Sequence, residues 1–143
     1  MAVELNHTFA TTKPIDQSYE TLLDLERTIP CVEGGRIVER TGPESARAEI
    51  VVSMGAMSLS YSGTVEISEA DPDAHRVVMT VKSKEAGGQG HANATVVFTA
   101  AEGGGTIHTV AQITGTAASM GEGIVSGVLD AMITDFASKL GSA

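Results

Sequence analysis

Four histidines and one cysteine are the side chains of this 143-residue sequence that most often act as bases, nucleophiles or metal ligands: His7, Cys31, His75, His91 and His108. The histidines are far apart, and none forms the pair at positions i and i+4 that a zinc-binding helix uses. No serine has the flanking glycines of a hydrolase nucleophile. These side chains therefore predict neither a metal site nor a catalytic residue.

Three glycines, at positions 121, 123 and 127, form a second pattern that could do chemistry, because closely spaced glycines can open a phosphate-binding turn. The dinucleotide fingerprint requires two residues between its last two glycines and a parallel strand after the helix. Here three residues separate Gly123 from Gly127, and no strand pattern follows. The phosphate-binding pattern Gly-x-x-x-x-Gly-Lys-Ser/Thr is also absent, so the sequence predicts no nucleotide site.

Charge and composition exclude further classes of protein. The 9 Lys and Arg residues face 18 Asp and Glu residues, and the net charge of −9 repels the phosphates of nucleic acids. A single cysteine excludes an internal disulfide and suits a reducing compartment. Neither a signal peptide nor an apolar stretch long enough to span a membrane is present. We expect one cytoplasmic domain over residues 1–143.

The elements that would hold a site follow from the spacing of apolar residues. Alternation over residues 3–9 predicts a first strand, and helical spacing from Ile15 predicts two short helices that end before Gly34. Alternation then returns and continues to about residue 115, broken by five short turns. Such turns join antiparallel strands. The predicted fold is α+β, with a seven-stranded antiparallel sheet that has one apolar face.

Residues 119–136 have the spacing of the one long helix, which must cover that apolar face. Two explanations of its three glycines remain open. They let the helix pack closely on the sheet, or a curved sheet holds the helix away and the missing side chains leave room for a ligand. In the second case a leucine at Gly123 or Gly127 would block binding. The helix residues predicted to face inward are Met120, Ile124, Val128 and Met132.

Several short motifs resemble those of the CoxG family, named after the G-type subunit of carbon monoxide dehydrogenase, a branch of the START-like, or SRPBCC, helix-grip superfamily. The resemblance covers essentially the whole chain. Two departures are Glu33, where the family usually has a proline before the glycine, and Ala56, where a proline often follows Gly55. The motifs are Leu5-x-x-x-Phe9, Leu22-Leu23-Asp24, residues 29–34, Met54-Gly55-Ala56-Met57, residues 61–65, residues 90–94, Ile113-Thr114-Gly115 and Met120-Gly121.

The resemblance implies a curved sheet wrapped around the long helix, with a hydrophobic cavity between them. It also implies an accessory role without catalysis: binding a respiratory quinone such as menaquinone and linking a molybdenum-containing carbon monoxide dehydrogenase, or a related hydroxylase, to the inner face of the cell membrane. No covalent cofactor is expected. Two alternatives remain open. One is a cyclase or hydrolase that uses Tyr61, His7 and Thr109, and the other is an assembly factor that binds no ligand.

The expected ligand-binding residues come from the inward rows of the strands, from the long helix and from the region near the mouth of the cavity. Their role would be apolar lining, with the hydroxyl of Tyr61 or a nearby backbone group meeting a carbonyl oxygen of the ligand. The residues are Leu22, Ile29, Ile50, Val52, Met54, Met57, Leu59, Tyr61, Met79, Val81, Phe98, Ile113, Met120, Ile124, Val128 and Met132.

Overall fold

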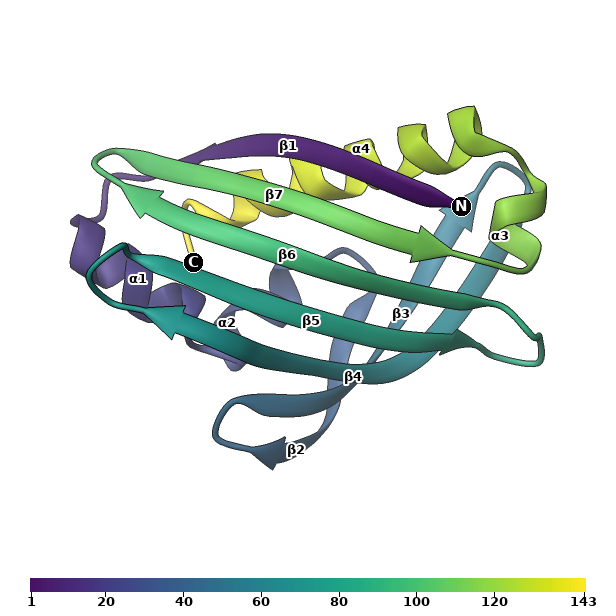
Figure 1. Ribbon diagram of the computed structural model, residues 1–143, viewed down its shortest axis with the longest axis horizontal. Helices are drawn as coiled ribbons and strands as arrows, with labels where there is room; N and C mark the ends of the chain where they lie inside the picture. Colours follow the sequence, from purple (N-terminus) through teal and green to yellow (C-terminus); the bar gives the residue numbers. More distant parts are fainter.

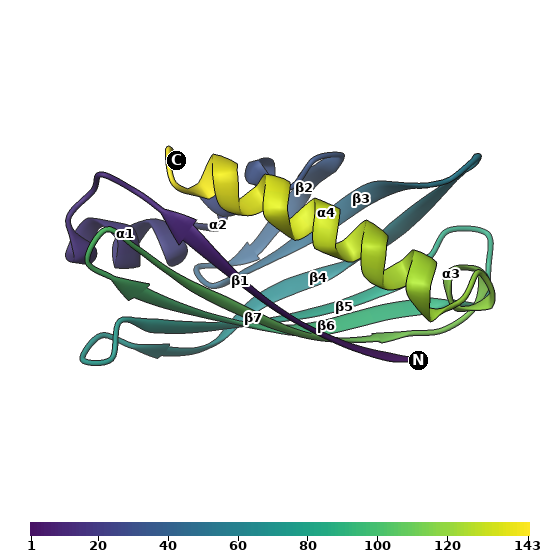
Figure 2. The ribbon, with the colours of Figure 1, turned by 90° about the horizontal axis from the view of Figure 1, so that it is seen from above.

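A seven-stranded sheet and a long terminal helix make up most of the computed structural model, which describes residues 1–143. In Figure 2 the helix α4 runs across one side of the sheet, and α1 and α2 lie at one end. The predicted α+β fold is confirmed. The elements are β1 (Ala2–Ala10), α1 (Ile15–Leu22), α2 (Leu25–Thr28), a 3-10 turn (Ile29–Cys31), β2 (Gly35–Gly42), β3 (Ser45–Met54), β4 (Met57–Asp71), β5 (Arg76–Glu85), β6 (His91–Ala101), β7 (Gly104–Ile113), α3 (Thr116–Ser119) and α4 (Glu122–Leu140).

The strands are all antiparallel to their neighbours, in the order β1-β7-β6-β5-β4-β3-β2 (Figure 1). Register shifts between Ile67 and Glu69 on β4 and at two places on β2 mark bulges, which increase the local bend and twist. Gly63 lies so close to the Lys82 carbonyl of β5 that a Cβ atom would collide with it. Glycine therefore permits close approach of the two backbones where the sheet curves.

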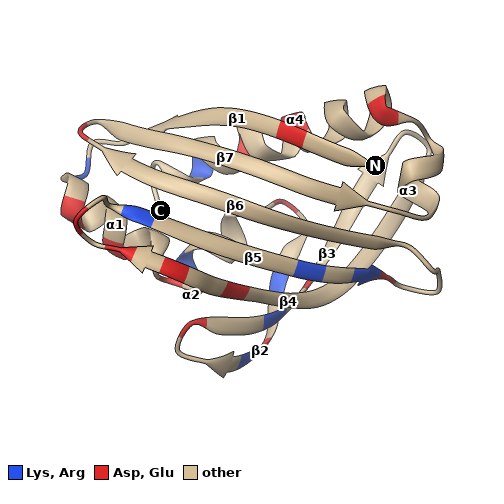
Figure 3. Cartoon of the chain, viewed as in Figure 1, with Lys and Arg blue, Asp and Glu red and all other residues tan.

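The two faces of the sheet differ in polarity, as the alternation predicts. Side chains such as Val77, Met79 and Phe98 are buried on the inner face, whereas Lys82 and Lys84 lie on the outer face. Charged residues occur mainly in turns, in the helices and in β2 to β5, and β6 and β7 carry none (Figure 3). The middle of the sheet is therefore uncharged on both faces.

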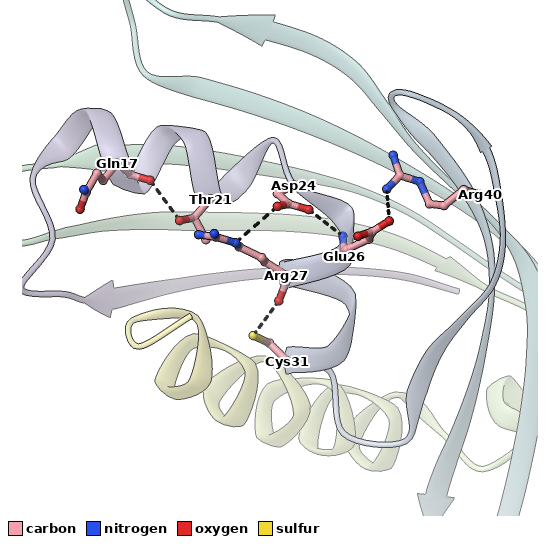
Figure 4. A network of polar contacts seen from close by, with 7 residues as sticks. All are labelled: Gln17, Thr21, Asp24, Glu26, Arg27, Cys31 and Arg40. Carbon is pink, nitrogen blue, oxygen red and sulfur yellow. Dashed lines mark hydrogen bonds and ion pairs between the residues drawn. The ribbon is translucent and has the colours of Figure 1, made fainter.

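Local hydrogen bonds fix the segment between β1 and β2 (Figure 4). The Asp24 carboxylate accepts a bond from the Glu26 backbone N–H at 3.0 Å, which caps α2 at its N-terminus. Arg40 of β2 pairs with Glu26 at 3.0 Å and so ties the helix to the sheet edge. The Cys31 thiol is buried and donates to the Arg27 carbonyl, which places it in the core and not in a reactive site.

Gly121 lies between α3 and α4, and its φ of 100° breaks the helical path there. The expected inner side of α4 is wrong by about one residue. Val125, Phe136 and Leu140 are buried, whereas Ile124 is 50% exposed. No helix of the structure has both the length and the apolar character needed to cross a membrane.

The glycines of α4 do not thin its inner side, contrary to the expectation from the sequence. Gly123 and Gly127 are exposed, and a Cβ atom built on either one meets no atom within 4 Å. Neither close packing of the helix nor space inside the fold explains them, because both glycines face outward. We have no physical account of why these two positions are glycine.

The core consists of two separate apolar clusters. One has 15 buried residues and joins α1 and α2 to the C-terminal part of α4, with Leu22, Leu25 and Phe136 among them. The other has 9 buried residues, including Tyr61 and Val125, and lies at the end where β3 and β4 meet and α4 begins. The space between these clusters contains the candidate site.

Candidate ligand-binding cavity

A cavity of about 270 Å³ lies between the inner face of the sheet and α4. Of its 26 lining residues 22 are hydrophobic, so it suits an apolar molecule. The lining comes from both core clusters and consists of Thr28, Ile29, Val32, Ile50, Val52, Met54, Tyr61, Val65, Met79, Val81, Ser83, Ala92, Asn93, Ala94, Val96, Phe98, Ile107, Thr109, Ala111, Ile113, Ala117, Val125, Leu129, Met132, Ile133 and Phe136.

The size of the cavity limits what it can hold. An apolar protein cavity of roughly 150 Å³ stays dry and takes one benzene ring. The present cavity has about 270 Å³ and so has room for two fused rings and a short chain. A long isoprenoid tail needs additional space beyond it.

Small residues in the sheet create this space. Ala94 of β6 and Ala111 of β7 are Cα partners, and both line the cavity. Ala92, one step along the same inner row of β6, pairs with Ile113 and also lines the cavity. Each alanine leaves unfilled the volume that a larger side chain would occupy below α4. The alanines of the sheet, and not the glycines of α4, therefore provide the room.

Aromatic side chains lie toward the end of the cavity that is near α1 and α2. The rings of Phe98 and Phe136 have centroids 6.0 Å apart and are tilted by 52°, an arrangement that aromatic pairs favour. Both rings belong to the larger core cluster and both line the cavity. This end of the cavity is consequently well packed.

Polar lining residues are few, and their partners differ. The Ser83 hydroxyl donates to the Ala92 carbonyl, and the Asn93 side-chain oxygen accepts a bond from the Ser83 backbone N–H. Thr28 and Thr109 are buried, and neither hydroxyl oxygen has a hydrogen-bond partner. An unpaired hydroxyl in such surroundings costs free energy of folding, of order 1–3 kcal/mol.

Tyr61 is the one lining residue with a side chain that can ionise. Burial raises the pKa of its phenol above the ordinary value, and the negative charge of Glu85 raises it further. The hydroxyl therefore remains protonated at neutral pH and can donate a hydrogen bond. No aspartate, glutamate, histidine or lysine lines the cavity.

The structure places most of the expected binding residues on the cavity wall. Whether they contact a ligand stays a prediction. Those that line the cavity are Ile29, Ile50, Val52, Met54, Tyr61, Met79, Val81, Phe98, Ile113 and Met132.

Six of the expected residues do not line the cavity. Leu22 is buried among α1, α2 and the end of α4, and Leu59 packs inside the smaller core cluster. Met57 is 45% exposed because it begins β4 just after the turn at the tip of the hairpin, beyond the cover of α4. The remaining three, Met120, Ile124 and Val128, fail because the inner side of α4 is rotated from the expected one.

The residues that were missed are mainly on α4. Val125, Leu129, Ile133 and Phe136 line the cavity at helical spacing. This spacing is visible in the sequence, and the position of Phe136 could have indicated the correct side. The alanines of the sheet belong to predicted inner rows, but small side chains carry no signal that a cavity lies above them.

The four histidines do not converge. His75 has a φ of 53° and pairs with Asp16 at 2.9 Å, and His108 lies 3.7 Å from Glu4. No group of three or more His, Cys, Asp or Glu side chains is arranged to hold a metal ion. His7, on the inner side of β1, pairs with Asp130 of α4.

Comparison with known proteins gives a family match and several structural matches. The sequence model of CoxG, described as the G-type subunit of carbon monoxide dehydrogenase, matches residues 8–143. No curated protein sequence matches. A conserved protein from Geobacillus kaustophilus shares 19% identity and superposes with a TM-score of 0.77, covering 99% of this chain and 93% of that one.

Two further solved structures have lower identity. The Zhui aromatase/cyclase from Streptomyces sp. R1128 shares 13% identity, with a TM-score of 0.65 and coverage of 99% of this chain and 93% of that one. The major latex-like protein 151 from Panax ginseng shares 9%, with a TM-score of 0.59 and coverage of 99% and 96%. At these identities the matches show the fold alone, and they confirm the predicted helix-grip fold.

Proposed function

The chain belongs to the CoxG family of carbon monoxide dehydrogenase, and from this premise we propose that it is an accessory protein that binds an apolar ligand without transforming it. The observation that carries the proposal is the cavity of about 270 Å³ with 22 hydrophobic residues among the 26 that line it. Burying apolar surface there contributes about 25 cal/mol for each Å² removed from water.

The ligand that we propose is a respiratory quinone of the menaquinone type. Two fused rings fit the available volume, and the first part of the tail would fill what remains. The few polar lining groups could orient the ring, whereas the apolar wall would hold it. Because such quinones hardly dissolve in water, a protein that shields the ring would allow it to meet a water-soluble enzyme.

A role without catalysis agrees with the lining of the cavity. General acid–base catalysis requires a group that can give or take a proton near neutral pH, placed within hydrogen-bond reach of the substrate. Tyr61 is the only ionisable lining residue, and burial moves its pKa away from neutrality. The aromatase/cyclase with the same fold supports no catalytic role here, because that likeness concerns the fold alone.

The partner that we propose is the molybdenum-containing carbon monoxide dehydrogenase that the family is named after, or a related hydroxylase. In this role the protein would link that enzyme to the membrane, where quinones reside. Peripheral contact at the inner face of the cell membrane would suffice for the exchange of ligand.

Native mass spectrometry of the purified protein tests the proposal, followed by organic extraction and identification of what was bound. We expect a co-purifying apolar molecule with a quinone ring. Ala94→Leu should remove it, because the larger side chain fills the cavity from the sheet. Val97→Leu, on the outer face of the same strand, is the matched control and should retain it. A protein that carries no apolar molecule, and takes up none when quinone is added, would instead support an assembly factor.

A further inference from the structure

Glu85 continues the inner row of β5 beyond the last residue that lines the cavity. Val81 and Ser83, four and two residues before it, both line the cavity, and strand alternation gives Glu85 the same inward parity. Its Cα partner on β4 is Tyr61, which also lines the cavity. A carboxylate is therefore placed beside the phenol at one end of an apolar chamber.

The carboxylate of Glu85 is packed against glycine backbone. A Cβ atom on Gly88 would lie 2.8 Å from the Glu85 Cδ atom, and one on Gly90 would lie 2.7 Å from Oε2. Gly115, which leads into α3, would place a Cβ atom 3.3 Å from the same oxygen. The β5–β6 turn and α3 lie at the same end of the molecule (Figure 1). Larger residues at these positions would displace the carboxylate.

No group of the chain satisfies this carboxylate. The Oε2 atom of Glu85 is buried and has no hydrogen-bond partner, although the residue as a whole is partly exposed. Leaving a charged acceptor buried and unpaired costs more than leaving a neutral one, so the site favours a partner that brings a hydrogen-bond donor. The negative charge of Glu85 also helps to keep the Tyr61 phenol protonated by raising its pKa.

We propose that Glu85 and Tyr61 form the polar end of the cavity and select neutral ligands that carry a hydroxyl group over ligands that carry a carboxylate. The inference rests on the proposed function, because it concerns the same cavity. A ligand hydroxyl supplies the donor that Oε2 lacks. A ligand carboxylate would bring a second negative charge next to the first, and like charges in a buried site repel strongly. A quinone-type ligand would accordingly be held better as the hydroquinone, which has two hydroxyl groups, than as the quinone, which has none.

Three probes with the same ring system test this selection: naphthalene, 2-naphthol and 2-naphthoate. Binding is measured by titration calorimetry at neutral pH. The wild type should bind 2-naphthol about tenfold or more tightly than 2-naphthoate. Glu85→Gln should raise the affinity for 2-naphthoate by about tenfold, because the repulsion is removed. Glu102→Gln, at an exposed turn, is the matched control and should change neither affinity.

Tyr61→Phe provides a second variant that keeps the ring and removes the hydroxyl. It should weaken binding of 2-naphthol and leave that of naphthalene unchanged, and thermal unfolding checks that both variants fold. Naphthalene separates the two hypotheses. If naphthalene binds and Glu85→Gln leaves the ratio of 2-naphthol to 2-naphthoate affinities unchanged, selection by Glu85 is wrong while the apolar site stands. If none of the three probes binds, the proposed function itself is wrong.

Discussion

The Nε2 atom of His7 lies 2.8 Å from the Oδ1 atom of Asp130, and this hydrogen bond joins β1 to α4. The His7 side chain is only 10% exposed, whereas the Asp130 side chain is 61% exposed. The contact crosses 123 positions of sequence and lies on the side of α4 opposite its contact with β3. One edge of the helix that covers the cavity is thus attached to the sheet by a specific polar pair.

A double-mutant cycle with His7→Phe and Asp130→Ala should give a coupling free energy of about 0.5–1.5 kcal/mol in stability. The cycle removes the separate effects of ring burial and of helix propensity. Urea unfolding of the four proteins provides the measurement. His108→Phe combined with Asp130→Ala is the control, because His108 lies on the outer face of β7, and this pair should show no coupling. Equal coupling in both cycles would mean that the bond does not attach α4.

Gly127→Ala should stabilise the protein by about 0.5–1 kcal/mol, because the position is an exposed helix interior with open space around the added methyl group. Ligand binding should stay unchanged, since the position faces away from the cavity. Gly121→Ala is the matched comparison. It also meets open space, but its φ of 100° is unfavourable for alanine, so it should destabilise. Thermal unfolding distinguishes the two. Loss of ligand in Gly127→Ala would restore the idea that this glycine faces inward.

Most of the fold could be predicted from the sequence because strand alternation and short turns are local signals. The long alternation from Leu59 to Ile67 corresponds to the inner row of β4, with Leu59, Tyr61 and Ile67 buried. Such a pattern has period two, and an error of one residue would reverse the faces. Turns at fixed positions prevented that error.

The side of α4 that faces inward was harder to predict. Ile124 and Val128 are as apolar as Val125 and Leu129, so the helix is apolar around much of its circumference and its spacing does not define one side. The packing of α4 on β1, through His7 and Asp130, decides the rotation, and that contact is not local in sequence. The cavity volume likewise depends on how far the helix stands from Ala94 and Ala111, a distance that no sequence pattern encodes.

Thr109→Val should stabilise the ligand-free protein by about 1 kcal/mol or more. The Thr109 hydroxyl is buried without a partner, and valine has nearly the same shape without a polar group to bury. Thr21→Val is the control, because the Thr21 hydroxyl donates to the Gln17 carbonyl at 3.0 Å and its loss should destabilise by about 1 kcal/mol. Chemical denaturation gives both values. A destabilised Thr109→Val protein would mean that this hydroxyl has a partner, such as an ordered water.

The thiol of Cys31 should react slowly with iodoacetamide in the folded protein. Burial raises the pKa of the thiol above its ordinary value, and this effect exceeds the opposing effects of Lys139 and Lys13. Because the folded state holds the proton more tightly than the unfolded state, the thiol contributes stability below the unfolded pKa of about 9, and the contribution is lost as the pH rises further. Stability should therefore fall less steeply above pH 9 in Cys31→Ala than in the wild type, even though the cavity left by the substitution lowers its stability at every pH. Parallel slopes for the two proteins in urea unfolding between about pH 7 and pH 10 would show that the thiol has the same pKa in both states.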